Sequence, residues 1–301
     1  MIKISVILPI YNVAPYLDET FYSIINQSLR EIEIIAVNDG STDNSEEIVK
    51  KHKETDSRII LLNQNNQGQS VARNLALQYA SGKYVYMMDS DDILSNSNAL
   101  QICYDYAEKN QADFIFFDGD SFPEKGASRT SWNTKRTHLL KENTRYDGNY
   151  LFNLMLDTRK HNCVVWLLMI NRNYLNSINL YFYPGIIHED ELFTTILTLS
   201  SNAIYCLKQQ SLIKHRIRTS STMGLKFTKR NLNCYLTVID ELLKFQDSPI
   251  IWKFAKYTLS RVFYTGHILP MKEKVSVFWR VIKSGYLKYI GLKSTLVFWL
   301  K

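Results

Sequence analysis

The chain has 301 residues, of which 46% are hydrophobic, so it is long enough for one large α/β domain or two smaller domains with proper cores. This content of Ile, Leu, Phe and Tyr excludes disorder as the main state, and only 11 glycines and 6 prolines exclude a fibrous or low-complexity chain. The net charge is +7 and is unevenly distributed. Residues 226–301 contain 14 basic and 4 acidic residues (+10), whereas residues 1–225 contain 22 basic and 25 acidic residues (−3). This asymmetry predicts a basic C-terminal region that binds an anionic surface.

Strand and helix patterns alternate over the first 120 residues. Strands are predicted at Ile4–Pro9, Glu33–Val37, Ile59–Leu62, Tyr84–Met88 and Phe114–Phe117, and helices at Tyr16–Gln27, Ser45–Lys53, Ser70–Ala80 and Leu100–Lys109. Strands separated by helices of about ten residues indicate βαβ units and a parallel sheet. Ligands of such sheets bind beyond the carboxyl ends of the strands.

The rest of the chain gives coarser signals. Residues 121–145 are polar and predict a loop or a pair of short strands, residues 146–225 mix helix and strand patterns, and residues 226–301 are mostly helical and rich in aromatics and lysine. No segment has 18 uninterrupted apolar residues, so no transmembrane helix is expected, and Met1–Pro9 resembles a first strand more than a signal peptide.

The four cysteines favour a reducing compartment. They lie far apart, and none belongs to a C-x-x-C pair (Cys103, Cys163, Cys206 and Cys234). This spacing argues against a disulfide framework or a zinc site and suits a cytoplasmic protein.

Two polar clusters follow predicted strands and should face one crevice. In Asn38–Ser41, Asp39 could accept hydrogen bonds from a nucleoside, but the same residues are good turn formers, and Asp43 with Glu46 could form a capping box for the next helix. In Asp89–Asp92, three carboxylates within four residues suit a hard divalent ion that also binds phosphate oxygens. The alternative is an N-cap cluster for the helix near Leu100.

Two later segments also carry candidate chemistry. His188–Phe193 opens an apolar helix, so its acids either complement the helix dipole or hold a carboxylate base toward the crevice. Lys214–Thr222 is basic and could contact phosphate, or it is a solvated loop. Arg73 either contacts the phosphate or the nucleobase, or it is a surface residue. Trp166 is either a platform on which a sugar stacks or a core residue.

Taken in order, these segments resemble family 2 glycosyltransferases of the bacterial cell-surface polysaccharide kind. The motifs are Pro9–Asn12, Asn38–Asp43, Asn66-x-Gly68-x-x-x-Ala72-Arg73-Asn74, Asp89–Asp92 and Glu189-Asp190. The resemblance is dense over residues 3–110 and thinner to about residue 225. It implies an α/β GT-A fold, with a Rossmann-like, mostly parallel central sheet flanked by helices and a helical C-terminal extension.

The resemblance also implies a domain division. Residues 1–225 would be the catalytic domain, with a nucleotide-binding half at 1–110 and an acceptor-binding half at 111–225. Residues 226–301 would be the basic helical region.

Site roles are likewise carried over from the resemblance. The nucleotide-sugar set is Pro9, Tyr11, Asn12, Asp39, Arg73, Asp89, Ser90, His215, Arg216 and Arg218. Within it, Asp39 would bind the uracil or ribose. Asp91 and Asp89 would hold Mn²⁺ or Mg²⁺ on the diphosphate, with Asp92 assisting. Asp190 would be the general base, and the acceptor side would include Trp166, His188 and Glu189.

The implied reaction is a single inverting displacement that moves one sugar from a UDP-sugar to a glycan or lipid-linked acceptor. Processive relatives carry a Gln-x-x-Arg-Trp motif and transmembrane helices, and neither is found here. The alternatives that stay open are a nucleotide-sugar binder without transfer and a nucleotidyltransferase. The turn after the first strand lacks G-x-G-x-x-G, which argues against a dinucleotide oxidoreductase, and the lack of a P-loop motif excludes a P-loop enzyme. No nucleic-acid-binding motif is seen, so no nucleic-acid partner is expected.

The C-terminal tail supports a further expectation. From Lys274 to Lys301, basic residues interleave with Trp and Tyr, which suits peripheral binding to the inner face of the cell membrane. The alternatives are a helical subdomain that packs its aromatics on the body, or a homo-oligomer contact.

Overall fold

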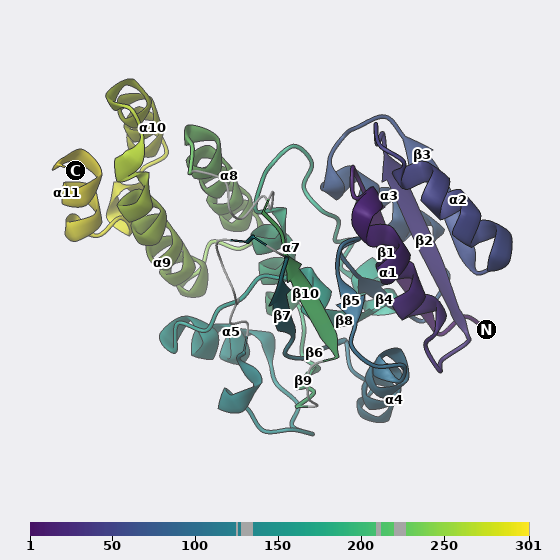
Figure 1. Ribbon diagram of the computed structural model, residues 1–301. Coiled ribbons are helices and arrows are strands. Elements are labelled where there is room, and N and C mark those ends of the chain that lie inside the picture. Colours follow the sequence, from purple (N-terminus) through teal and green to yellow (C-terminus); the bar gives the residue numbers. More distant parts are fainter. Residues whose placement is uncertain (125, 128–134, 209–211, 220–226, 301) are drawn as a thin grey trace.

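Figure 1 shows the computed structural model, which describes residues 1–124, 126–127, 135–208, 212–219 and 227–300. Its centre is a seven-stranded sheet in the order β3-β2-β1-β4-β8-β6-β9. The strands are β1 (Ile4–Ile10), β2 (Ile32–Asp39), β3 (Ile59–Gln64), β4 (Tyr84–Met87), β6 (Phe114–Phe116), β8 (Leu168–Asn171) and β9 (Ile204–Cys206). All run parallel except β8, which pairs antiparallel with β4 and β6. The predicted mostly parallel α/β sheet is confirmed.

Helices cover both faces of this sheet. They are α1 (Ala14–Ile25), α2 (Ser45–Thr55), α3 (Gln69–Tyr79), α4 (Ala99–Asn110), α5 (Gly148–Asp157), α6 (Arg172–Ser177) and α7 (Glu189–Leu199). Alternate residues of β1 point to opposite faces that are both covered, which explains why its sequence is apolar apart from Ser5. Val6 and Leu8 join one hydrophobic core with α1 and α4, whereas Ile7 joins the other core with α3 and α7.

A second, three-stranded sheet lies beside the central one, in the order β5-β10-β7. Its strands are β5 (Ile93–Leu94), β7 (Asp120–Pro123) and β10 (Ile213–Ile217). The sheet therefore joins the segment after Asp92 to the basic stretch 214–222. That stretch begins as a strand instead of a loop, and its residues 220–222 lie outside the described residues.

Four further helices form the C-terminal part of the chain, at the yellow-green side of Figure 1. They are α8 (Lys229–Phe245), α9 (Pro249–Thr265), α10 (Met271–Lys283) and α11 (Leu292–Leu300), with a 3₁₀ turn at Tyr286–Tyr289. They enclose a third hydrophobic core, to which α5 contributes Phe152 and α7 contributes Leu192 and Leu199. Over the described residues, none of the helices has the length and hydropathy needed to span a bilayer. The division between 225 and 226 stays a prediction.

Candidate active site

The carboxyl ends of β1, β2 and β4 bring the first predicted residues to one edge of the sheet. β1 lies between β2 and β4 and runs parallel to both. The segment after β1 therefore lies beside Asp39 at the end of β2 and beside the acids that follow β4. The sequence predicts a crevice at this edge, and the strand order brings these residues to it.

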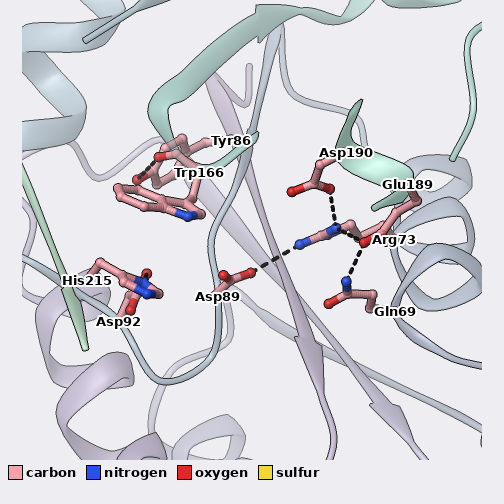
Figure 2. Close-up of polar contacts among 9 residues, drawn as sticks. All are labelled: Gln69, Arg73, Tyr86, Asp89, Asp92, Trp166, Glu189, Asp190 and His215. Carbon is pink, nitrogen blue, oxygen red and sulfur yellow. Dashed lines mark hydrogen bonds and ion pairs between the residues drawn. The ribbon is translucent and has the colours of Figure 1, made fainter. Parts of the chain in front are cut away.

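Arg73 connects Asp89 to two consecutive acids much later in the sequence, Glu189 and Asp190 (Figure 2). It lies on α3 and is 2% exposed. Its Nη1 is 3.1 Å from Glu189 Oε1 and 3.0 Å from Asp190 Oδ1, and its Nη2 is 3.1 Å from Asp89 Oδ1. Gln69, one turn earlier on α3, donates a further hydrogen bond to Glu189. Arg73 is thus neither a surface residue nor a free cation, because its guanidinium orients the acids of β4 and α7.

Asp190 differs from its neighbour Glu189 in exposure. Glu189 is 2% exposed, whereas the side chain of Asp190 keeps 22% of its surface accessible. Burial raises the pKa of Asp190 to about 8, Arg73 acts in the opposite direction, and the charges of Glu189 and Asp89 add to the rise. A carboxylate with a raised pKa, held at one oxygen and accessible at the site, is suited to accept a proton near neutral pH.

On the other side of Asp89 lies a pair formed by Asp92 and His215 (Figure 2). Asp92 is fully buried, and its Oδ2 is 2.9 Å from His215 Nδ1. Burial raises the pKa of Asp92 to about 7, against the effect of its hydrogen bond with His215. The ring of His215 stacks on Trp166 with centroids 5.1 Å apart. Trp166 is 3% exposed, so it is a core residue that supports His215 and not a platform for a sugar.

The basic residues of β10 and its end contact acids of the site. Arg218 Nε lies 2.6 Å from Asp91 Oδ2. Arg216 donates its backbone N–H to Asp92 and forms an ion pair with Glu19 of α1. Burial and the charge of Asp89 raise the pKa of Asp91, while Arg218 lowers it. These contacts hold the basic segment over the Asp89–Asp92 turn, so its described part is not a solvated loop.

One group of side chains in this region has the composition of a metal site. Asp89, Asp92 and His215 each offer a ligand atom, and these atoms all lie within 4.8 Å of one another. Two carboxylates and an imidazole are a donor set that fits Mn²⁺ and also accommodates Mg²⁺. The sequence analysis named Asp91 and Asp89 for this role, and in the structure Asp91 is paired with Arg218. The assignment of the ligands stays a prediction.

Asp39 organises the loop that leads into α3. Its Oδ1 accepts hydrogen bonds from Gln64 Nε2 (2.7 Å) and the backbone N–H of Gln67 (2.8 Å), and its Oδ2 accepts one from the backbone N–H of Gly68 (2.8 Å). Gly68 has φ +87°, a left-handed conformation that favours glycine. Asp39 is 3% exposed, so it fixes the start of the helix that carries Arg73.

The turn after β1 is tied to the turn after β2. Asn12 has φ 52°, donates its backbone N–H to Ser41 Oγ, and accepts a hydrogen bond from the backbone N–H of Thr42 at its Oδ1. Pro9 is half-buried, and Tyr11 is exposed beside it. Ser90 is buried, with its carbonyl oxygen accepting from Thr20. The proposed capping box with Asp43 does not form, since Glu46 instead accepts hydrogen bonds from Asn38 and Asn63.

The third acid of the 188–191 cluster has a structural role that the sequence analysis missed. Glu191 is 4% exposed, with Oε2 3.1 Å from His161 Nε2 and Oε1 3.3 Å from Arg261 of α9. The apolar residues Leu192, Phe193, Ile196 and Leu197 lie on the other side of α7, so helical spacing alone would have marked Glu191 as outward-facing. His188 stacks on Tyr235 of α8, with centroids 4.1 Å apart.

Comparison with known proteins gives one family. The family model described as glycosyl transferase family 2 matches residues 5–178. The uncharacterized glycosyltransferase YibD of Escherichia coli is 33% identical over 240 residues, which are 77% of this chain and 66% of YibD. The minor teichoic acid biosynthesis protein GgaB of Bacillus subtilis is 28% identical over 325 aligned positions, which cover 89% of this chain and 35% of GgaB. The chain therefore spans about two thirds of one relative and one third of the other.

Solved structures share the fold. A crystal structure of S. aureus TarS with UDP-GlcNAc aligns over 98% of this chain and 84% of that chain, with a TM-score of 0.75 and 19% identity. The mannosyltransferase PcManGT from Pyrobaculum calidifontis, in complex with GDP-Man and Mn²⁺, aligns over 95% of this chain and 77% of its own, with a TM-score of 0.62 and 15% identity. At these identities the similarity establishes the GT-A arrangement of sheet and helices.

Proposed function

Because this chain belongs to glycosyl transferase family 2, we propose that it transfers one sugar from a UDP-sugar to a hydroxyl group of a glycan or lipid-linked acceptor. The observation that carries the proposal is the convergence of Asp89, Glu189 and Asp190 on Arg73 at the carboxyl edge of the sheet. The UDP-GlcNAc and UDP in the TarS structures support a UDP-linked donor.

Asp190 is the general base in this proposal. It takes the proton of the acceptor hydroxyl, whose oxygen forms a bond to the anomeric carbon as the bond from that carbon to the UDP oxygen breaks. Attack from the face opposite UDP inverts the configuration, so an α-linked donor gives a β-glycoside. Arg73 holds Oδ1 of Asp190, and the side chain of Asp190 stays partly accessible for the proton. A positioned base contributes about 10²–10⁴-fold in rate.

The leaving diphosphate needs positive charge. A divalent ion held by Asp89, Asp92 and His215, with Asp91 as the further candidate, would stabilise the negative charge that develops on UDP. Arg216 and Arg218 lie on the same side of the site and are the proposed phosphate contacts of the chain itself. Because both are ion-paired, to Glu19 and Asp91, a bound diphosphate would compete with these acids for them.

The nucleoside end is assigned to the turns after β1 and β2. Pro9 and the exposed ring of Tyr11 are proposed to line the uracil pocket, with Asn12 fixing the turn. Asp39 is proposed to reach the uracil or ribose, although its carboxylate already accepts three hydrogen bonds from the 64–68 loop. His188 and Glu189 are proposed for the acceptor side only through their position beside Asp190.

The biological setting is proposed as cell-surface polysaccharide synthesis at the inner face of the cell membrane. The support is the name of one relative, GgaB, a minor teichoic acid biosynthesis protein. Acceptors of this kind end in sugar or polyol hydroxyls, which are the groups that a carboxylate base activates.

The test is a panel of UDP-sugars with Mn²⁺ and a lipid-linked acceptor mimic, read by UDP release and by analysis of the product. We expect a β-glycoside plus UDP. In the same assay, Asp190→Asn should lower transfer. Its matched control is Asp105→Asn, which changes an exposed acid of α4 and should leave transfer unchanged. Pyrophosphate as the product would indicate a nucleotidyltransferase instead, and UDP binding without release would indicate a binding protein.

A further inference from the structure

Helices α10 and α11 present an apolar face to solvent. Its members are Met271, Val275, Trp279 and Ile282 of α10 and Leu292, Leu296 and Leu300 of α11, hereafter the α10–α11 face. Trp279 is 59% exposed and Leu292 is 76% exposed. Single exposed apolar residues are ordinary, whereas seven on two helices that touch each other indicate an interaction surface.

Helical spacing shows that this exposure is organised. At about 100° per residue, the four α10 members fall within about 80° of arc. The residues that attach α10 to the body, Val277 and Val281, lie on the opposite side and are fully buried in the third core. Folding therefore already uses one apolar side of α10, and the second apolar side has no partner among the described residues.

The stripes of the two helices touch at one edge. Phe278 lies at the edge of the α10 stripe, and Trp299 lies at the edge of the α11 stripe by the same helical count. Their rings contact each other edge to face, with centroids 5.1 Å apart. The stripes of α10 and α11 thus meet along this ring contact.

Lysines border the face. On the helical wheel of α10, Lys272 and Lys283 are the neighbours of Trp279 at one edge of the apolar stripe. Lys293 lies at the corresponding edge of the α11 stripe, and Lys288 lies on the 3₁₀ turn between the helices. All four are exposed. The one acid in residues 271–300 is Glu273, which lies on another side of α10. Two copies joined through this face would bring lysines against lysines, so the charge pattern favours an anionic partner.

We propose that the α10–α11 face binds peripherally to the anionic surface of a lipid bilayer. Trp279 and the aliphatic members enter the boundary between headgroups and acyl chains, where tryptophan is favoured. The four lysines remain at the level of the lipid phosphates and contribute electrostatic attraction. This binding goes beyond sugar transfer and does not depend on it.

The experiment is co-sedimentation of the full chain with vesicles of phosphatidylcholine alone or mixed with phosphatidylglycerol, at low and high salt. We expect binding to the mixed vesicles, weaker binding to phosphatidylcholine, and loss of binding as salt rises. Trp279→Glu should weaken the binding at least about tenfold. Lys272→Gln with Lys283→Gln should weaken it about fivefold for each lysine.

Matched controls lie at the opposite end of the molecule. Tyr79→Glu changes an exposed aromatic residue at the end of α3, and Lys51→Gln with Lys53→Gln changes two exposed lysines of α2. Neither control should alter vesicle binding. Circular dichroism and UDP titration of every variant verify that the fold and the nucleotide site are intact.

Three results would overturn the proposal. One is failure of the wild-type chain to bind the mixed vesicles. Another is an equal loss of binding in the α2 lysine control. The third is a Trp279→Glu variant that binds vesicles normally but changes from oligomer to monomer in analytical ultracentrifugation, since the face would then join copies of the chain. None of these results bears on UDP release, so sugar transfer is tested separately.

Discussion

Replacement of Glu191 by Gln should lower the stability of the protein without touching the proposed base. Glu191 is 4% exposed and lies between His161 and Arg261, at 3.1 and 3.3 Å. Burial by itself would raise its pKa, but the hydrogen bond with His161 and the surrounding positive charges lower the pKa from 4.5 to about 2. At 1.36 kcal/mol per pKa unit, this fall corresponds to roughly 3 kcal/mol of folding free energy at neutral pH.

The pH dependence of this contribution has a definite sign. Because the pKa is lower in the folded state, the stabilisation is fully present above the unfolded pKa of 4.5 and is lost as the pH falls toward about 2. Urea unfolding of the wild type and of Glu191→Gln should therefore differ by up to about 3 kcal/mol near neutral pH, and the difference should shrink once the pH is below 4.5.

Two further variants serve as comparisons for the stability loss in Glu191→Gln. Glu47→Gln removes an exposed acid of α2 and should cost less than about 1 kcal/mol. Arg261→Gln removes a half-exposed partner, so it should cost less than the loss of Glu191 itself. A Glu191→Gln variant within about 1 kcal/mol of the wild type at neutral pH, or a difference that does not change with pH, would refute the reasoning.

Three other variants test the site directly. Asp190→Asn should lower transfer by about 10²–10⁴-fold while UDP still binds in calorimetry, and normal turnover would remove Asp190 from its role. His215→Ala and Asp92→Asn should each weaken Mn²⁺-dependent UDP binding by about tenfold or more, and affinity that stays equal with and without Mn²⁺ would contradict the ligand set. Asp39→Asn should lower the free energy of unfolding by about 1 kcal/mol, because the partly buried N–H of Gly68 loses its acceptor, and an unchanged urea midpoint would count against this.

The alternating part of the fold could be predicted because its signal is local. Strands such as β1 and β2 are buried on both faces, so their sequences are predominantly apolar, and turn residues and helices separate them. All five predicted strands and four predicted helices of the first 120 residues are confirmed, with ends that differ by a few residues.

The antiparallel strand β8 could not be predicted in this way. It has only four residues, and its partners β4 and β6 lie more than 50 residues earlier in the chain. Its position depends on tertiary pairing, which leaves no periodic pattern in so short a segment.

The proximity of several candidate site residues was predicted, but their contacts were not. Sequence order placed Asp89, Asp190 and Arg73 in one crevice, yet it gave no reason for one guanidinium to bind acids 16 and 117 residues away. The same limit applies to Asp92 and His215, which are 123 residues apart and meet only because β5 and β10 pair. The role of Glu191 was not predictable either, because the apolar residues of α7 lie on the other side of the helix and its partners His161 and Arg261 are distant in the sequence.

The position of α7 has a consequence for recombination between related chains. At its start, α7 carries Glu189 and Asp190 against Arg73, and with Leu192 and Leu199 it packs into the core formed by α8 and α9. A hybrid that grafts foreign C-terminal helices onto this body would have to bring a compatible α7 with them. Viable recombination breakpoints between relatives should therefore fall before residue 188, and a junction at 226 should misplace Asp190, the proposed general base.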